Sequence, residues 1–446
     1  GDCPGLQCAP SWRGRAFHQC SAAACTCHCQ SSRSGACANS APFSIELTWS
    51  DQARPMTEEL DQIFVTAKRE LLEFVPTEYR PVASVLLSIL PLLAVFPGLF
   101  ALTTLLERKG LGRIQNRLGP NRVGPFGLLQ PVADGLKTLF KETVQPRAAD
   151  RVVFFLAPVF LVIPALLTYS VIPFGRNMTP LDMEGALLFF FAVGAGTELA
   201  VFMAGWASRN KYSLLGAMRA IAQMLSYEIP LILSVVPVIM LTGTLSPTKI
   251  VEAQNVYTAS IAHWNLFTPW GIAGFALFLI AAAAESNRSP FDLPEGESEI
   301  IAGYYIEYSG FKFALFFLGE YLGLFAICSL GITLFLGGWT APFEFLAWIP
   351  SWVWFFAKLL ALICFFIWVR GTMPRVRMDQ LMNFAWKFML PLALINILAA
   401  AAWRFTPMLG FKWLVSGLIV LIGYILLGQG LTRKAQYTKR TYRFAT

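Results

Sequence analysis

The chain has 446 residues, of which 56% are hydrophobic, 14% are aromatic and only 14% are charged. Soluble domains have about a quarter of their residues charged, so this composition excludes a water-soluble globular protein and, over most of the length, intrinsic disorder. The formal net charge is +8. The basic residues stand between apolar segments rather than in one stripe, which argues against a nucleic-acid partner and favours a membrane protein.

The first 80 residues are predicted to lie outside the apolar part of the chain. Seven of the nine cysteines fall between Cys3 and Cys37, without apolar periodicity. A disordered, Cys-rich tail over residues 1–55 is therefore favoured over a metal or disulfide motif, and it is interpreted as upstream translated sequence or an artefact. Residues 56–80 have apolar residues near helical spacing and are expected to form an amphipathic helix on the outer membrane surface.

Nine apolar segments are of a length that crosses a bilayer, which needs about 20 residues per helix. They cover residues 82–106, 152–173, 185–206, 219–242, 266–284, 313–336, 349–370, 388–403 and 413–430. The predicted fold class is therefore all-α. We expect a polytopic membrane helix bundle over residues 81–430, with large loops at 107–151 and 285–312 and a basic tail at 431–446.

Lys and Arg residues are divided unequally between the two ends of these segments. The connections at one end carry 23 of them, whereas the opposite end holds only Arg176, Lys249, Arg404 and Lys412. By the positive-inside rule, the basic side faces the cytoplasm or the matrix. The C-terminus is therefore expected on the cytoplasmic side.

Carboxylates inside or beside the apolar segments are the candidates for chemistry. A charge at the bilayer centre costs about 2.5–3.5 kcal/mol, so it needs a partner or a water-filled cavity. Four acids lie within or at the ends of predicted spans: Glu184, Glu198, Glu228 and Glu320. Six more follow the fifth span: Glu285, Asp292, Glu295, Glu297, Glu299 and Glu307. Such a concentration is typical of a proton or cation relay, but a solvated acidic loop that docks onto a basic neighbour explains it equally well.

A basic loop rich in Gly and Pro follows the first span and reads ERKGLGRIQNRLGPNRVGPFG from Glu107. It lacks both common phosphate-loop patterns, and its backbone is able to bend tightly against a partner or an anionic lipid surface. Asp134 and Lys137 follow one helical turn apart in a segment that we interpret as an interfacial helix. The three histidines are too scattered for a haem or zinc site, so no redox centre is expected in this chain.

Four stretches of the sequence resemble subunit 1 (the H subunit in bacteria) of NADH:quinone oxidoreductase, respiratory complex I. They are ERKGLGRIQNRLGPNRVGPFGLLQPVADGLKTLFKE, GWASRNKYSLLGAMRAIAQMLSYEIP, AESNRSPFDLPEGESEIIAGYYIEYSGFKFALFFLGEY and RGTMPRVRMDQLMNFAWKFMLPLAL. The resemblance extends over residues 82–403. The family core has eight spans, so the ninth, C-terminal span and the N-terminal tail depart from it and inherit no function.

The resemblance implies roles for individual residues. Quinone-binding positions of the family are matched by Arg108, Arg117, Asp134, Phe313 and Phe317. The family's chain of proton-relay carboxylates is matched by Glu228, Glu285, Asp292, Glu295, Glu297, Glu299, Glu307 and Glu320, with Arg219 as a basic partner. Glu198 matches an acid that only some members carry, so its role stays open. The implied substrate is a quinone, either ubiquinone or menaquinone, and no flavin, iron–sulfur cluster or haem is expected on this chain.

The implied function is that of a membrane-arm subunit of a proton-pumping quinone reductase, a translocase. The implied partners are the peripheral-arm subunits of the quinone module and the small membrane subunits that lead to antiporter-like subunits. The bacterial inner membrane is favoured over the mitochondrial inner membrane. Two other functions compete: a stand-alone cation/proton antiporter, although no internal inverted repeat is seen, and the membrane anchor of a hydrogenase without quinone.

Overall fold

The computed structural model describes residues 60–258, 261–293, 301–406 and 408–434. Within these ranges, eight apolar helices are long enough to cross a membrane. The 17-residue helix α10 (Pro269–Glu285) is also apolar but shorter. These helices coincide with the nine predicted segments, so the prediction of an all-α polytopic membrane bundle is confirmed. The predicted tail at 1–55 and most of the tail at 431–446 fall outside the described residues.

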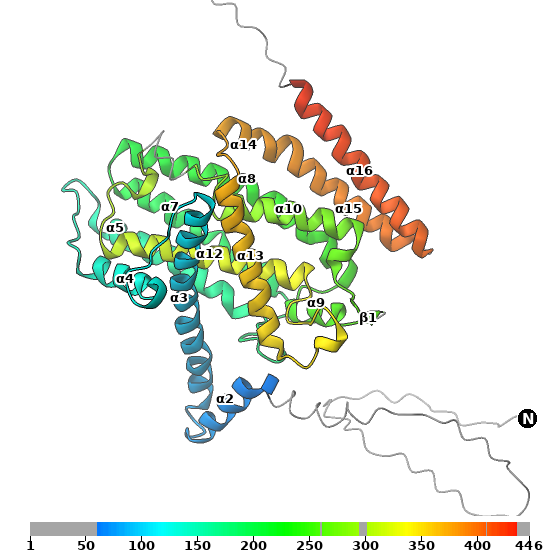
Figure 1. Cartoon of the computed structure of the whole chain (residues 1–446), viewed down its shortest axis with the longest axis horizontal. Coiled ribbons are helices and arrows are strands. Elements are labelled where there is room, and N and C mark those ends of the chain that lie inside the picture. The colour runs from blue at the N-terminus through cyan, green and yellow to red at the C-terminus, as the bar shows by residue number, and fades with distance from the viewer. Residues whose placement is uncertain (1–59, 259–260, 294–300, 407, 435–446) are drawn as a thin grey trace, which may run out of the picture. The chain divides into compact units, whose positions relative to one another are not determined.

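Each long apolar segment consists of one to three helical elements in direct succession (Figure 1). In chain order they are α3 (Arg80–Ile114), α5 (Arg151–Thr168) with η2 (Tyr169–Val171), α6 (Ala186–Gly194) with α7 (Gly196–Ala207), α8 (Lys211–Thr242), α10, α12 (Phe311–Phe335), α13 (Ser351–Thr372), α14 (Met378–Phe384) with η6 (Ala385–Met389) and α15 (Leu390–Phe405), and α16 (Leu409–Lys434). The π-helical segment η6 joins α14 to α15 without a break.

Short elements connect these helices. They are α2 (Ile63–Glu73), η1 (Pro125–Gly127), α4 (Gln130–Phe140), α9 (Pro247–Gln254), η3 (Asn265–Phe267), η4 (Gly303–Tyr305), η5 (Glu344–Leu346) and the strands β1 (Tyr257–Thr258) and β2 (Ile261–Ala262). The two strands form an antiparallel hairpin in which Tyr257 pairs with Ala262. The sequence did not predict this hairpin, because two residues per strand are too few to show an alternating pattern.

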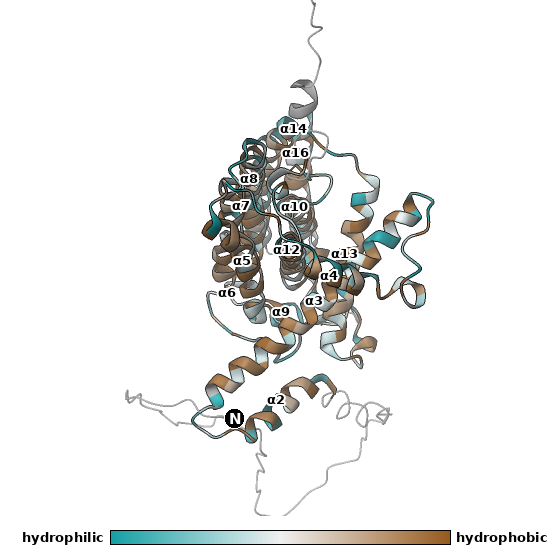
Figure 2. Ribbon diagram, turned by 90° about the vertical axis from the view of Figure 1, so that its left-hand side faces the viewer, coloured by the Kyte–Doolittle hydropathy of each residue, from teal (hydrophilic) through white to brown (hydrophobic). Residues whose placement is uncertain are grey.

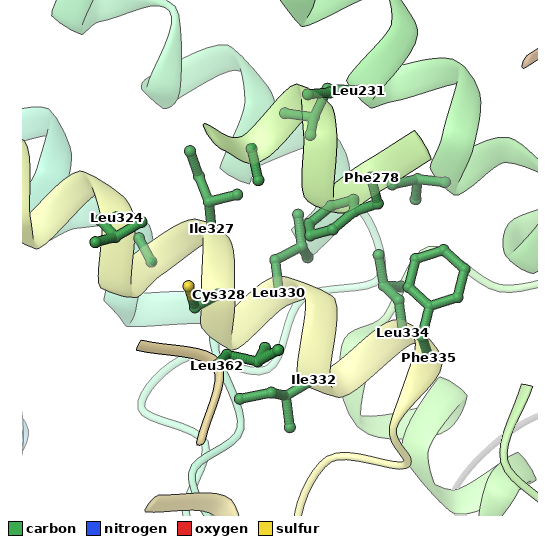
Figure 3. Packing of buried hydrophobic residues seen from close by; sticks show 14 of the residues in the cluster. Leu231, Phe278, Leu324, Ile327, Cys328, Leu330, Ile332, Leu334, Phe335 and Leu362 are labelled. Atoms are coloured by element: carbon green, nitrogen blue, oxygen red, sulfur yellow. The ribbon is translucent and has the colours of Figure 1, made fainter. Parts of the chain in front are cut away.

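Helix α12 lies at the centre of the hydrophobic core (Figure 3). Its residues between Leu324 and Phe335 pack against Leu231 of α8, Phe278 of α10 and Leu362 of α13. A helix that is apolar on every face is stable only when protein or lipid surrounds it on all sides. Because it touches helices from both halves of the chain, α12 holds the polar residues near its N-terminus in a fixed place.

Polar side chains set the ends of several spans. Asn210 accepts a hydrogen bond from the backbone N–H of Tyr212 at 3.0 Å and so caps α8, which ends at Gly243 in the left-handed conformation with φ 70°. Asp61 accepts a 2.7 Å hydrogen bond from the backbone N–H of Ser351 at the start of α13. These are the usual ways of satisfying unpaired groups at helix ends.

The first span differs from its predicted boundaries. The sequence predicts an end at residue 106, where three charged residues begin, but α3 continues to Ile114 and is 35 residues long, about 52 Å at 1.5 Å per residue. The helix continues because Glu107 is neutralised inside the protein rather than solvated in a loop. The other end of α3 extends beyond the other long helices, with only α2 drawn beside it (Figure 1), and has a hydrophobic surface (Figure 2).

Candidate functional site

Glu107 is a buried carboxylate on α3, with 5% of its surface exposed. It forms ion pairs with Arg370 of α13 and with Arg288, whose Nη1 lies 3.3 Å from Oε1. The hydroxyl of Tyr321 on α12 donates a further hydrogen bond to Glu107. A buried carboxylate needs such partners because its desolvation is costly. Three helices and the segment after α10 therefore meet at this one group.

Arg288 is the centre of the charge cluster, which we define as Glu107, Arg288, Glu320, Tyr321 and Arg370. Its guanidinium Nε lies 3.8 Å from Oε1 of Glu320, and its carbon Cζ lies 3.8 Å from the centroid of the Tyr321 ring. Burial lowers the pKa of Arg288, but Tyr321, Glu320 and Glu107 together raise it above its ordinary value. Arg288 therefore stays cationic and joins two carboxylates from different helices.

Glu320 connects this cluster to a group of aromatic rings. Its Oε2 accepts a hydrogen bond of 3.2 Å from the hydroxyl of Tyr305, whose ring stacks on Phe317 with centroids 5.8 Å apart. Phe313 and Phe317, one turn apart on α12, have centroids 4.7 Å apart. The two predicted quinone-lining phenylalanines thus lie next to a carboxylate of the predicted relay.

A cavity of about 80 Å³ separates Glu320 from Glu285. Both carboxylates line it, together with Thr168, Thr197 and Ser286. A cavity needs roughly 10–15 Å³ for each water molecule and polar groups to bond it, so this one has room for several. The cavity therefore has room for water between the two acids, although most of its lining residues are apolar.

Glu285 also lies close to two further acids. It interacts electrostatically with Glu198 of α7 and Glu228 of α8. Within the described part of the chain, Oε2 of Glu285 and Oε1 of Glu198 are buried and have no hydrogen-bond partner. Three carboxylates from three helices therefore share one partly buried region beside the cavity.

Arg108 points to a different neighbour than Glu107 does. It forms an ion pair with Asp134 of α4, and Gln130 donates a hydrogen bond of 3.0 Å to the other carboxylate oxygen of Asp134. The two charged side chains are partly exposed, at 54% and 37%. Helix α4 contacts both α3 and α12, so this pair lies near the buried charge cluster but remains open to a ligand.

The Gly- and Pro-rich loop folds back onto α3. Lys109 donates a hydrogen bond to the carbonyl oxygen of Phe126. A Cβ on Gly119 would lie 2.9 Å from Cα of Lys109, and one on Gly127, which has φ 77°, would lie 2.1 Å from the carbonyl oxygen of Pro120. These glycines permit backbone contacts that no other residue allows. The surface that the loop approaches is therefore the end of α3 itself.

Comparison with known proteins identifies the family. The profile of the NADH dehydrogenase family matches residues 87–401. The NADH-quinone oxidoreductase H subunit of Dehalococcoides mccartyi (strain CBDB1) is 51% identical over 296 residues, which is 66% of this chain and 80% of the relative. That of Polaromonas naphthalenivorans (strain CJ2) is 42% identical over 355 residues, 78% of this chain and 98% of the relative. The chain belongs to the family of NADH-quinone oxidoreductase H subunits.

Several of the residues matched to the H-subunit family lie together. Arg108 contacts Asp134, Phe313 contacts Phe317, and Glu285 shares the cavity with Glu320. Two other residues of the predicted sets have different partners: Arg117 donates a hydrogen bond to Gln115, and Glu307 accepts one from Asn210. Arg219 lies on α8, and Asp292 follows α10. Glu295, Glu297 and Glu299 lie outside the described residues.

The sequence did not single out Glu107, Arg288, Tyr321 or Arg370. Glu107 stands at the start of the basic loop string, and Arg288 stands within the acid-rich string, so neither residue is conspicuous among its charged neighbours. The signal that could have found them is the presence of opposite charges at the edges of neighbouring apolar segments, since buried charges need partners.

Proposed function

We propose that this chain is the membrane subunit of an NADH-quinone oxidoreductase that takes part in quinone binding and couples quinone reduction to proton translocation. Membership in the H-subunit family supports the assignment to such a complex. The observation that carries the coupling role is the buried charge cluster, because it lies between the Arg108–Asp134 pair and the cavity lined by Glu285 and Glu320.

The proposed quinone site lies where α4 meets α3 and α12. Phe313 and Phe317 offer apolar ring surface for a quinone and its tail, and the Arg108–Asp134 pair offers a donor and an acceptor for the headgroup. Arg117, exposed beyond the end of α3, extends the basic region toward the entrance. A mostly apolar surface with a few oriented polar groups is typical of small-molecule sites.

Quinone reduction takes up two electrons and two protons and yields the quinol. The electrons come from a partner subunit, because we expect no redox centre on this chain. As the headgroup gains negative charge, the nearest cations and acids, Arg108 and Asp134, experience the change first. Glu107 is adjacent to Arg108 and forms ion pairs with Arg288 and Arg370. A change of charge at the quinone site therefore alters the electrostatic potential at the charge cluster.

The relay then passes from the charge cluster to the cavity. Arg288 holds Glu320 within 3.8 Å, and Glu320 faces Glu285 across the cavity. Glu198 and Glu228 continue the series beyond Glu285. Coupled carboxylates titrate as a group, so a charge change at one end alters proton occupancy at the other. The proposed relay also includes the basic partner Arg219 and five further acids: Asp292, Glu295, Glu297, Glu299 and Glu307.

We propose a bacterial inner-membrane protein with its basic side in the cytoplasm. Two exposed lysines provide matched probes: Lys137 on α4 and Lys249 on α9. In intact cells, an impermeant thiol reagent is expected to label a Lys249→Cys variant but not a Lys137→Cys variant, each compared with the parent chain. Labelling of Lys137→Cys alone would reverse the orientation.

Photo-crosslinking tests the function. An azido-quinone added to the purified complex is expected to label residues 108–140 or 305–317, and excess unmodified quinone is expected to compete. Co-purification with an NADH-oxidising partner is expected as well. Cation/proton exchange by the chain alone in liposomes, without such a partner, would instead support the antiporter function.

A further inference from the structure

Gln223 on α8 is fully buried and its amide is directed at the segment that follows α10. Its Nε2 donates to the carbonyl oxygens of Ala284 and Phe291, both at 2.7 Å, and lies 3.3 Å from Oδ1 of Asn287. Three oxygen acceptors around one nitrogen fix which end of the amide is the donor. One side chain therefore joins α8 to both ends of the turn 284–291.

This turn carries two groups of the candidate site on opposite sides. Glu285 lines the cavity, whereas Arg288 enters the charge cluster. Asn287, in the left-handed conformation with φ 49°, reverses the chain between them. Arg288 N–H bonds the carbonyl oxygen of Ala283 at 3.1 Å and so closes the end of α10, as in a Schellman motif. A rotation of this turn would move Glu285 and Arg288 together.

Helix α8 carries the next acid, Glu228, and a second contact to the same turn. Tyr227, one turn from Gln223, has its ring 5.7 Å from that of Phe291 and donates to the carbonyl oxygen of Leu381 at 2.9 Å. The distance from Glu285 to Glu228 is therefore set where α8 holds the turn. Gln223 supplies the hydrogen bonds of that attachment.

We propose that Gln223 is a positioning residue for proton coupling: it holds the turn 284–291 on α8 so that Glu285 and Arg288 keep their places between the charge cluster and Glu228. The inference rests on the proposed relay function. Gln223 takes no part in proton transfer itself, because its amide does not titrate. It acts through the position of its two neighbours.

Loss of the Gln223 amide leaves the turn's carbonyl groups with other partners. The carbonyl oxygen of Ala284 also accepts from the N–H of Asn287 at 3.3 Å, and that of Phe291 accepts from the N–H of Leu293 at 3.0 Å. No backbone acceptor of this turn is therefore stranded when the amide is removed, which limits the loss of stability. We expect the complex to assemble while the turn loses its fixed position.

The test compares Gln223→Met with Gln254→Met in the assembled complex in membranes. Gln254 on α9 is an equally buried glutamine whose amide makes three hydrogen bonds, to Ile250, Thr333 and Asn265, away from the turn. Per assembled complex, Gln223→Met is expected to lower kcat by up to about 100-fold, as a small misplacement of a reacting group does, and to lower the number of protons pumped per electron. KM for quinone should stay unchanged, and Gln254→Met should change neither quantity.

Two outcomes would overturn the proposal: wild-type kcat and proton ratio in Gln223→Met, or equal losses in both variants. If Gln223→Met fails to assemble, Gln223→Asn is measured instead, because its side chain keeps the amide but is one methylene shorter. A wild-type proton ratio in Gln223→Asn would then refute the proposal, and a lowered ratio would support it. Failure of the relay itself is recognised separately, because Glu228→Gln would then pump normally.

Discussion

Glu107 and Arg108 are neighbours on α3, but their side chains lie in different environments. Successive helix residues point about 100° apart, so Glu107 enters the bundle while Arg108 turns toward α4. The Glu107 and Arg288 side chains are 7% and 9% exposed, whereas those of Arg108 and Asp134 are 54% and 37% exposed. Loss of one partner in a buried pair strands a charge, and loss of one in an exposed pair does not. The two pairs therefore predict different consequences of mutation.

We expect Glu107→Gln to reduce stability strongly. It removes the carboxylate that forms ion pairs with both Arg288 and Arg370, so of the ion pairs in the charge cluster only Arg288–Glu320 remains. Removing one partner of a buried pair costs about 3–5 kcal/mol. The measurement is the amount of assembled complex and its thermal inactivation temperature after detergent extraction.

Charge balance provides the control for this variant. In Glu107→Gln combined with Arg370→Gln, Arg288 and Glu320 remain as a neutral pair, so part of the lost stability should return. Glu184→Gln, which removes an exposed partner of Lys249, should have little effect. A double variant less stable than Glu107→Gln alone would contradict the charge-balance argument.

We expect Arg108→Ala and Asp134→Asn to assemble normally but to lower NADH:quinone turnover. Each removes one charge of a partly exposed pair, so the energetic loss is small, whereas a quinone headgroup would lose a donor or acceptor. Turnover per assembled complex and KM for quinone are measured. The control is Lys137→Ala, which lies on α4 with Asp134. Normal turnover and KM in both variants would remove this pair from the quinone site.

At the scale of elements, hydropathy predicted the positions of the nine apolar helices in the described part of the chain but not all of their ends. Charges at Glu107 and Arg108 indicated a loop, although α3 continues to Ile114. Likewise, α8 begins at Lys211 rather than at residue 219. A charged residue ends an apolar pattern in the sequence, but it ends a helix only when the rest of the fold provides no partner for it.

The site was predictable in its residue types but not in its pairings. Local strings pointed to Arg108, Asp134 and the acids, and Asp134 does meet Arg108. Glu107 and Arg288 are 181 residues apart, and no local pattern indicates that they meet. Gln223 is a single amide in an apolar helix, so its role is visible only from the hydrogen bonds that it makes in the fold.

Close packing between α8 and η4 gives a prediction at the element scale. A Cβ on Gly216 would lie 2.5 Å from Cα of Gly303, which is backbone and has little freedom to move. We expect Gly216→Ala to destabilise the protein by about 1–3 kcal/mol, as overpacking does, and to displace Tyr304 and Tyr305 from Glu320. Gly98→Ala on α3, where a Cβ meets nothing within 4 Å, is the control. Equal thermal inactivation of the two variants would contradict this.

At the scale of the whole protein, the candidate site is a series of charges that crosses from one group of helices to another. It begins with Arg108 and Asp134, passes through the charge cluster and the cavity, and reaches Glu198 and Glu228. No single helix carries more than a few of these groups. Each step of the proposed relay depends on contacts between helices that α12 and the turn 284–291 hold together, so we expect a charge change at one end to reach the other only if the fold keeps these groups aligned.

Glu228 on α8 provides the sharpest test of this series. Arg219 lies nine residues earlier, about 13 Å along a helix at 1.5 Å per residue, so the two side chains do not pair along α8, whereas Glu228 interacts electrostatically with Glu285. Glu228→Gln keeps the size and hydrogen bonding of the side chain but removes the exchangeable proton.

We therefore expect Glu228→Gln to assemble but to lose most proton pumping and most quinone-coupled turnover, by about 100-fold, the lower range for a positioned proton-transfer group. Glu228→Asp retains a carboxylate and should keep part of both activities. Proton release per electron in sealed vesicles is the measurement, and Glu252→Gln, exposed on α9, is the control. If Glu228→Gln pumps as many protons per electron as the wild type, Glu228 serves packing alone and proton movement from Glu285 must bypass α8.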